Sequence, residues 1–216
     1  MRTEGKRAAA RSRSQMMTMR IDRRGFILAW LPLLAALNAG ALARGDNVLI
    51  VDDFSRDDLT STLGTPWRGF SDQVMGGISK ETIALTEIEG RRALRLSGDV
   101  RLENNGGFIQ AALDLAPAKQ THDASAFTGV LLVVRGNGER YGIHLRTPEC
   151  VRPWQSYRVG FIAAPEWREI RLPFASFEPY RLTEPLGVGH LRRISLVAIG
   201  RAFHADLAVS AVGFYS

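Results

Sequence analysis

Residues 129–146 read Gly-Val-Leu-Leu-Val-Val-Arg-Gly-Asn-Gly-Glu-Arg-Tyr-Gly-Ile-His-Leu-Arg, and this stretch indicates the fold. Its first part, Gly129 to Arg135, is an almost unbroken apolar run, which is typical of a strand buried on both faces. Its last part, Tyr141 to Arg146, alternates apolar and polar side chains, as a strand does when only one face meets a core. Gly136-Asn137-Gly138 between them has turn chemistry. We therefore predict two strands joined by a hairpin.

Short apolar bursts of the same kind continue along the chain in both directions. We predict further strands at residues 48–51, 93–96, 108–115, 157–161, 167–172, 194–199 and 203–214. Gly, Pro and Asn turn signals separate them, and no window of about a dozen residues has the 3.6-residue stripe of an amphipathic helix. Many short strands at this spacing favour an all-β fold, a single jelly-roll β-sandwich. At most a turn or two of helix is expected, near residues 56–63.

The first 43 residues differ from the rest and resemble an export signal. A basic stretch leads to the pair Arg23-Arg24, then to an apolar run from Phe26 to Leu37, and then to Ala41-Leu42-Ala43. A charged start, a short apolar core and a small-x-small end are the parts of a cleavable signal peptide. The run is shorter than the roughly 20 residues that span a bilayer, although an N-terminal membrane anchor is the alternative. The Arg-Arg-x-Phe string resembles the twin-arginine export motif, so we expect a periplasmic or otherwise exported protein.

The leader also carries the net charge of the chain. Eight of the 28 Lys and Arg residues lie within it, but only two of the 22 Asp and Glu residues. Residues 44–216 therefore contain equal numbers of basic and acidic side chains, although the whole chain has a net charge of +6. Nucleic-acid binding requires a basic surface that displaces counterions from phosphates, so no nucleic-acid partner is expected. These residues suffice for one domain.

Most signatures of catalysis are missing from the sequence. There is no G-x-S-x-G nucleophile elbow and no P-loop, and the four histidines lack metal-ligand spacing. Cys150 is the only cysteine, so no internal disulfide can form. The acidic pairs Asp52-Asp53 and Asp57-Asp58 are compatible with Ca²⁺ but are more typical of a solvated surface. We predict no catalytic residue, no metal site and no cofactor, and therefore a protein that is not an enzyme.

Two glycine-containing strings are candidates for a binding site. The first, residues 67–79, combines Trp67, Asp72 and Met75 with Gly76 and Gly77. Glycine lets the backbone approach another surface closely. The second, residues 102–108, places Asn104 and Asn105 before two glycines, where a tight turn is the alternative explanation.

Residues 72–79 resemble the D-x-V-M-G-G-x-S signature of the complex I intermediate-associated protein 30 family. Further matches follow in order at Trp67, Asn105-Gly-Gly-Phe108, residues 135–141, residues 144–147, Tyr157 and residues 167–174. The resemblance implies a galactose-binding-like jelly roll, a fold also used by carbohydrate-binding modules. Eukaryotic members of the family are mitochondrial factors for the assembly of respiratory complex I.

The leading hypothesis is an exported, non-catalytic binding domain, an interaction or assembly factor for a protein partner at the cell envelope. We predict that one surface is lined by Trp67, Asp72, Met75, Asn105, Arg146, Trp154 and Tyr157. Asp72 either pairs with Arg146 or holds the glycine loop; alternatively, Trp67 and Met75 belong to the core and Asp72 caps a turn. The second hypothesis is a carbohydrate-binding module, which predicts a concave groove with exposed aromatic faces. A flat apolar patch with a polar rim would favour the protein partner.

Overall fold

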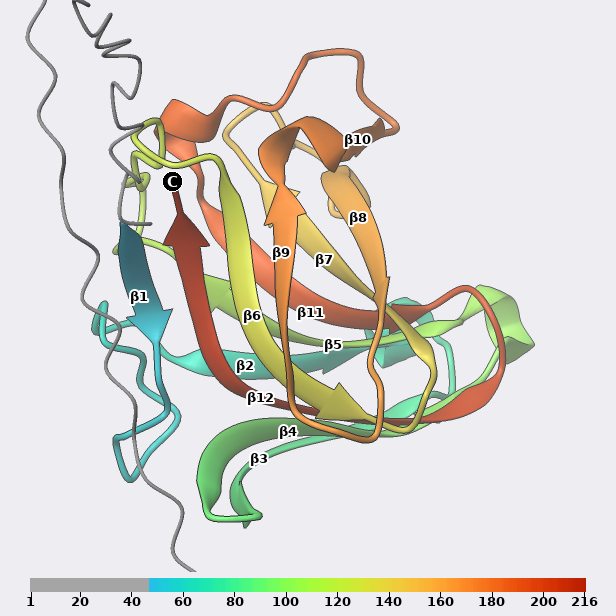
Figure 1. Ribbon diagram of the computed structural model, residues 1–216. Coiled ribbons are helices and arrows are strands. Elements are labelled where there is room, and N and C mark those ends of the chain that lie inside the picture. The colour runs from blue at the N-terminus through green and yellow to red at the C-terminus, as the bar shows by residue number, and fades with distance from the viewer. Residues whose placement is uncertain (1–46) are drawn as a thin grey trace, which may run out of the picture. The chain divides into compact units, whose positions relative to one another are not determined.

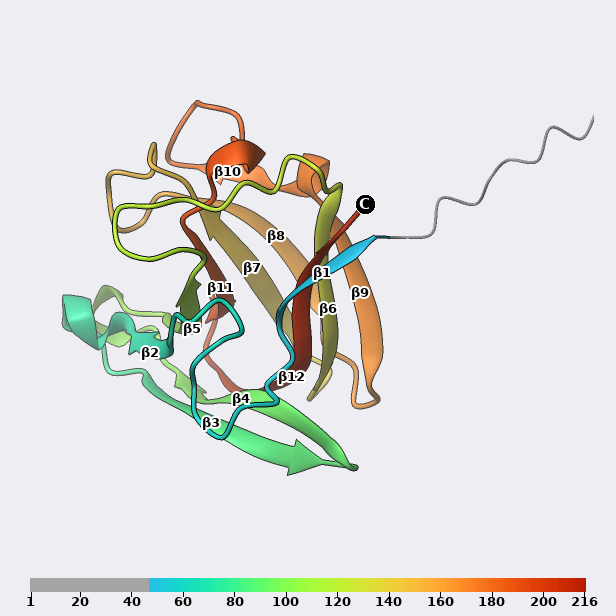
Figure 2. The ribbon, with the colours of Figure 1, turned by 90° about the vertical axis from the view of Figure 1, so that its left-hand side faces the viewer.

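Alternating apolar side chains fold the chain into two antiparallel β-sheets that pack face to face (Figures 1 and 2). The computed structural model describes residues 47–216. The predicted signal peptide, residues 1–43, lies outside the described residues. Within residues 47–216, no helix is long and apolar enough to span a membrane.

The first sheet is built around β12. Its strands lie in the order β3 (Lys80–Ile88), β4 (Arg91–Val100), β12 (Phe203–Tyr215), β6 (Gly129–Gly136) and β9 (Arg168–Pro173), and β1 (Val48–Asp52) also pairs with β12. In Figure 2, β6, β12 and β9 stand together on one side of the molecule, opposite β5, β11 and β7.

The second sheet carries the candidate site. Its strands lie in the order β10 (Glu178–Tyr180), β8 (Ser156–Ile162), β7 (Arg140–Arg146), β11 (Arg193–Ile199), β5 (Phe108–Asp114) and β2 (Trp67–Ser71). Four single turns of 3₁₀ helix join the strands: η1 (Asp72–Met75), η2 (Glu103–Asn105), η3 (Phe174–Ser176) and η4 (Val188–His190).

The core lies between the two sheets. Ile143 and Leu145 of β7 contribute to it from one sheet and Leu94 and Leu96 of β4 from the other, and all four side chains are fully buried. Each buried side chain of this size contributes about 1.5–3 kcal/mol, so the inward-facing half of every strand stabilises the sandwich. The fold is therefore all-β, as the apolar periodicity predicts.

The apolar run of Gly129–Arg135 forms the inner strand β6, between β12 and β9. Val130, Leu131, Leu132 and Val134 are all buried, so the prediction of a strand covered on both faces is confirmed.

The hairpin predicted at Gly136-Asn137-Gly138 is wrong, because β6 and β7 belong to different sheets. The turn crosses from one sheet to the other. The Asn137 side chain holds it there by accepting a hydrogen bond from the Tyr141 hydroxyl at 2.7 Å and donating one to the His204 carbonyl at 2.8 Å.

Three strands were not predicted, and each has a weak pattern for a physical reason. β2 is short and contains Gly69, β3 is half-exposed along its length, and β10 is an exposed edge strand containing Pro179. Pro is tolerated at sheet edges because no neighbouring strand needs its missing N–H. Near residues 56–63, where at most a turn or two of helix was expected, the chain forms bends, an isolated bridge from Thr60 to Pro66 and a turn.

Candidate ligand-binding groove

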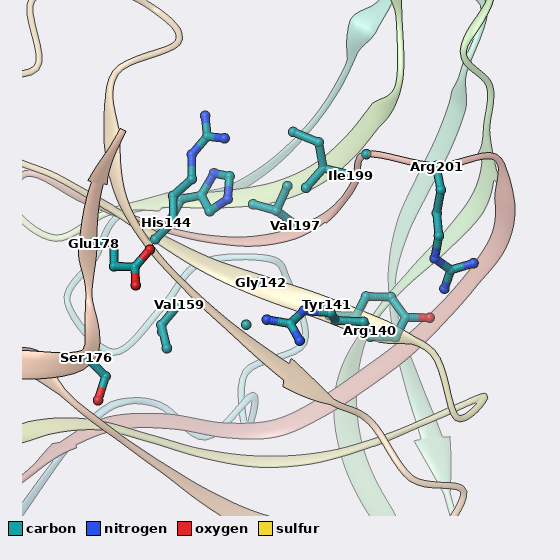
Figure 3. A pocket seen from close by; sticks show the side chains of 13 residues that line it. Arg140, Tyr141, Gly142, His144, Val159, Ser176, Glu178, Val197, Ile199 and Arg201 are labelled. Atoms are coloured by element: carbon teal, nitrogen blue, oxygen red, sulfur yellow. The ribbon is translucent and has the colours of Figure 1, made fainter. Parts of the chain in front are cut away.

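A groove crosses the outer face of the second sheet. Its volume is about 700 Å³, and all six strands of the sheet contribute to its lining. Successive side chains of a strand point to opposite faces, so the residues between the core positions face the groove. The strands contribute, among others, Phe70 (β2), Gln110 (β5), Val197 (β11), His144 (β7), Arg158 (β8) and Tyr180 (β10). A second hollow of about 490 Å³ continues the groove over β7 and β8 (Figure 3).

Asp72 lies beneath one rim of the groove and supports it. Its carboxylate is fully buried and joins two loops that are distant in sequence. It accepts hydrogen bonds from the backbone N–H and the hydroxyl of Ser79, and from the backbone N–H groups of Gly107 and Phe108. Because these donors come from the β2–β3 and β4–β5 connections, Asp72 fixes the positions of η1 and η2 relative to each other.

Glycines give the Asp72 carboxylate its space. A Cβ at Gly77 would lie 2.3 Å from the carboxylate, and a Cβ at Gly106 would lie 2.4 Å from its Oδ2 atom. Burial by itself raises the pKa of Asp72, but the hydrogen bonds from Ser79, Gly107 and Phe108 outweigh it and hold this pKa below its ordinary value. The carboxylate is therefore ionised at neutral pH and serves as an acceptor for both loops.

The opposite rim is the loop between β7 and β8. Arg146 braces this loop by donating to the carbonyl oxygens of Cys150, Arg152 and Pro153 at 2.7–3.2 Å. The brace supports Trp154, whose side chain is 54% exposed at the edge of the groove. A planar guanidinium with five N–H donors suits this multiple contact.

Arg158 and Tyr180 continue this rim. The Arg158 guanidinium carbon lies 3.4 Å from the centroid of the Tyr180 ring. Arg158 also donates to the Ser156 hydroxyl at 2.8 Å and to the Trp154 carbonyl at 3.1 Å. Burial lowers the pKa of Arg158, yet arginine stays charged near neutral pH. An aromatic ring and a fixed cation thus lie next to Trp154.

Two glycines form the floor of the second hollow. Gly142 of β7 lies directly opposite Gly160 of β8, and Val197 of β11 pairs with Gly142 on the other side. His144 stands beside this floor, opposite Arg158, and Figure 3 shows it projecting into the same hollow as Val197. Burial, reinforced by the charge of Arg158, lowers the pKa of His144 to about 3, so its ring is neutral.

Four of the predicted surface residues do line the groove, namely Met75, Asn105, Arg146 and Trp154. Trp67 and Tyr157 do not. Trp67 is only 2% exposed and donates from its indole to Asp52 at 2.7 Å, while Tyr157 is fully buried and donates from its hydroxyl to the Pro185 carbonyl. Both are core residues, because their strand positions point between the sheets.

The remaining predicted residues support the rim. Asp72 holds the glycine loops, and the Arg146 guanidinium bonds to carbonyls of its own loop, so the two residues do not pair. Gly76 takes the left-handed conformation that ends η1, with φ of 90°. Asn104 and Asn105 both have φ of 58° in the β4–β5 connection, which passes between the sheets and is not a hairpin.

Sequence reasoning missed Arg158, Tyr180, Val74 and Gln110, which all line the groove. The alternation of β8 places Arg158 on the same face as Ser156, so periodicity offered a signal for it. Tyr180 offered none, since its strand has three residues and contains a proline.

The acidic pairs near the N-terminus of the described chain have local roles. Asp52 is buried and accepts hydrogen bonds from Trp67 and from the backbone N–H of Phe54, and Asp53 accepts one from the Ser55 backbone. Among residues 47–216, no group of three or more His, Cys, Asp or Glu side chains is arranged to hold a metal ion.

The fold is a two-sheet β-sandwich that is similar to carbohydrate-binding modules of known structure. The family 11 module of the cellulosomal cellulase Lic26A-Cel5E of Clostridium thermocellum superposes with a TM-score of 0.61 at 13% identity, covering 78% of this chain and 94% of the module. A family 11 module from the same organism, solved with a β-1,3-1,4-mixed-linked tetrasaccharide, gives 0.58 at 16% identity, covering 77% and 94%. A family 30 carbohydrate-binding module gives 0.57 at 16% identity, covering 78% and 88%. At these identities the likeness shows the fold.

A comparison of the sequence with family models identifies the family. The model of the Complex I intermediate-associated protein 30 family matches residues 53–206, and the chain belongs to this family. No curated protein matches the sequence significantly.

Proposed function

We propose that this protein is an exported, non-catalytic binding domain whose groove holds an oligosaccharide. The observation that carries the proposal is the concave groove with two exposed aromatic side chains, Trp154 and Tyr180, at one rim. A sugar ring stacks on an exposed aromatic face, and convergent polar groups fix its orientation. Here Arg158, Gln110 and Asn105 supply donors and acceptors in the same groove.

The chemistry of the groove supports binding without catalysis. A general acid or base works best when its pKa lies near the working pH. Burial takes the pKa of His144 to about 3, far from that range. The neutral imidazole is suited to hydrogen bonding with a ligand hydroxyl.

The fold neighbours support the same proposal, because one of them was solved with a bound β-1,3-1,4-mixed-linked tetrasaccharide. In this chain the groove crosses the outer face of one sheet, where an extended ligand has access. Export, which rests on the twin-arginine leader, would bring the domain to compartments that contain extended glycans.

The test is calorimetric titration of the purified protein with cello-oligosaccharides, mixed-linked β-1,3-1,4 gluco-oligosaccharides and uronate oligosaccharides. We expect saturable binding to at least one probe, weakened by Trp154→Ala. Thr82→Val, on the exposed edge strand β3 of the other sheet, is the control. If no sugar binds, or if Trp154→Ala binds as the wild type does, the proposal fails.

A protein partner is the second candidate, because Val74 and Met75 on the η1 rim are 72% and 58% exposed. Exposed apolar side chains at a rim are typical of a protein contact. Cross-linking capture from the native cell envelope, with Met75→Ser as the control variant, tests this candidate. Recovery of one protein with the wild type but not with the variant would support it.

A further inference from the structure

Arginines dominate the lining of the groove and of the second hollow. Five line them, Arg140, Arg146, Arg158, Arg193 and Arg201, together with one carboxylate, that of Glu178. The chain from residue 44 onward contains equal numbers of basic and acidic residues. Positive charge is therefore concentrated on this face, and such a concentration attracts ligands of the opposite charge.

Two of these arginines already pair with carboxylates of neighbouring residues. Arg193 pairs with Asp114 at 2.7 Å, and Arg201 pairs with Glu139. Arg146 and Arg158 are different. Among the described residues their hydrogen bonds go to backbone carbonyls and, for Arg158, to the Ser156 hydroxyl. Both are half-buried, and the acceptors of these hydrogen bonds are uncharged.

Arg158 has the better access to a ligand. Its hydrogen bonds to the Ser156 hydroxyl and the Trp154 carbonyl use the Nε–H and one N–H of Nη2, and the Tyr180 side chain is a further hydrogen-bonding neighbour of the guanidinium. The Nη1 and Nη2 edge is the edge that binds a carboxylate through two parallel hydrogen bonds. Stacking on Tyr180 at 3.4 Å holds the plane of the guanidinium in place, and the hydrogen bond to the Trp154 carbonyl sets its direction.

The neighbours of Arg158 indicate the kind of molecule that carries the negative charge. Trp154 and Tyr180 line the groove beside it, and Gly142 and Gly160 lie in the second hollow, which Arg158 also borders. A cyclic ligand unit resting on this rim therefore meets the guanidinium at its edge. Glu178 is opposite Arg158 in the β8–β10 register and borders the second hollow, so its charge disfavours a ligand carboxylate on that side.

We propose that the groove selects acidic oligosaccharides, in which a uronate carboxylate is held by Arg158 while a sugar ring rests on Trp154, beside the stacked Arg158 and Tyr180 side chains. This inference rests on the proposed function and adds the chemical class of the sugar. Arg146 adds positive charge from the adjoining strand and keeps the Trp154 loop in position.

The experiment compares oligogalacturonate with its fully methyl-esterified form, which has the same backbone and no charge. We expect the purified protein to bind the charged form at least about tenfold more tightly at low salt, since charge-assisted hydrogen bonds are about twice as strong as neutral ones. This preference should shrink as NaCl rises from about 20 to about 300 mM, because salt screens charges at the surface. The salt series needs no variant and therefore does not depend on how a mutant folds.

Arg158→Gln should remove the preference for the charged oligogalacturonate. Arg158→Lys should keep part of this preference, because lysine retains the positive charge but lacks the planar pair of N–H donors of the guanidinium. Arg56→Gln, in an exposed bend away from the groove, removes the same charge and should leave the preference unchanged. A thermal melt of each variant establishes that it is folded.

The outcomes separate the two proposals. Equal binding of the charged and esterified sugars would overturn the acidic-sugar inference and leave the oligosaccharide function in place. Binding of no sugar at all would overturn both. Tighter binding of an acidic peptide such as hexaglutamate than of any uronate would also overturn both, in favour of an acidic protein segment.

Discussion

At the scale of single residues, Asp72 is a carboxylate with a structural task at the edge of a binding groove. Its side chain is fully buried, yet it fixes the positions of Met75 and Asn105, which are part of the rim. Three backbone N–H groups and one hydroxyl point at it. A neutral side chain cannot replace it, because an amide would turn a donor toward some of these donors.

We predict that Asp72→Asn lowers the free energy of unfolding by about 2 kcal/mol, the usual effect of leaving buried hydrogen-bonding groups without partners. Urea denaturation measures this change. Asp57→Asn is the matched control, since the Asp57 side chain is 97% exposed and its ion pair with Arg92 lies at the surface. A loss as large for Asp57→Asn as for Asp72→Asn would contradict the role of Asp72 as a buried clamp.

The difference in unfolding free energy between the wild type and Asp72→Asn depends on pH. The pKa of Asp72 in the folded protein is lower than the ordinary value of 3.8. The stabilisation is therefore fully present above pH 3.8 and is lost as the pH falls through the folded pKa. The gap between wild type and Asp72→Asn should accordingly narrow in acid. Burial raises the pKa of Asp52, so the contribution of Asp52 to stability falls as the pH rises, opposite to that of Asp72. The quantity to compare is therefore the difference in unfolding free energy between wild type and Asp72→Asn at each pH, not the pH dependence of the wild type alone.

Trp67 and Trp154 give a second prediction, because the two indoles have opposite surroundings. Trp67→Ala should lower the free energy of unfolding by about 4 kcal/mol, since it opens a cavity beneath β2 and removes the donor to Asp52. Trp154→Ala should change it by less than about 0.5 kcal/mol, as expected for an exposed side chain. Urea denaturation of both variants checks this. Similar losses of unfolding free energy in the two variants would mean that Trp154 contributes to the core and is not an exposed side chain available to a ligand.

At the scale of elements, β7 and β8 are the pair of strands that forms the floor. Gly142 and Gly160 face each other across the pair, and the Arg140 guanidinium lies over Gly160, where a Cβ would come within 2.5 Å of its Nη2 atom. Gly142 has more space, because its nearest neighbours would lie 3.5 Å from an added Cβ, an ordinary contact distance. A side chain could therefore be accommodated at Gly142, whereas at Gly160 it would have to displace the Arg140 guanidinium.

We predict that Gly142→Val weakens binding of the preferred oligosaccharide by about tenfold or more while changing the free energy of unfolding by less than about 1 kcal/mol. Valine is favoured in strands, and its branches would project into the hollow and displace the ligand. Calorimetry and urea denaturation measure the two effects. Thr82→Val on β3 is the control. Unchanged affinity in Gly142→Val would show that the ligand does not cross this floor.

At the scale of the whole molecule, we expect the N-terminal segment to direct export of the β-sandwich from the cytoplasm. We predict that changing Arg23 and Arg24 to lysine together retains the protein in the cytoplasm, because the export receptor reads the arginine pair as an address. Cell fractionation with an antibody against residues 44–216 measures this. Changing Arg2 and Arg7 to lysine is the control and should leave export intact. Normal export of the Arg23→Lys, Arg24→Lys form would show that another route is used.

The local pattern predicted most of the strands because each strand has one buried face, and burial imposes a period of two on its residues. β7 shows this most clearly: Ile143 and Leu145 are buried, while His144 and Arg146 face the groove. The same logic could not predict how the strands connect. Gly136-Asn137-Gly138 has the composition of a hairpin, but the next strand joins the other sheet, where Ile143 and Leu145 meet the core from the opposite side.

The site was predicted less completely than the fold. Met75, Asn105, Arg146 and Trp154 were placed on one surface, and they lie along the two rims of the groove. Trp67 was assigned to the same surface because its residue type is common in binding sites. Its strand position turns it inward, and residue type carries no information about which face of a strand is covered.

The sequence by itself determined the class of fold, the family and the presence of a basic leader, because periodicity, a signature string and charge are properties of neighbouring residues. Only the tertiary structure determined the groove. It arises because β7, β8 and β11 lie side by side with Gly142, Gly160 and Val197 in register, while loops from distant parts of the chain form the rims. Register and rim positions depend on contacts between residues far apart in sequence, such as those of Asp72 with Gly107, and no local pattern records them.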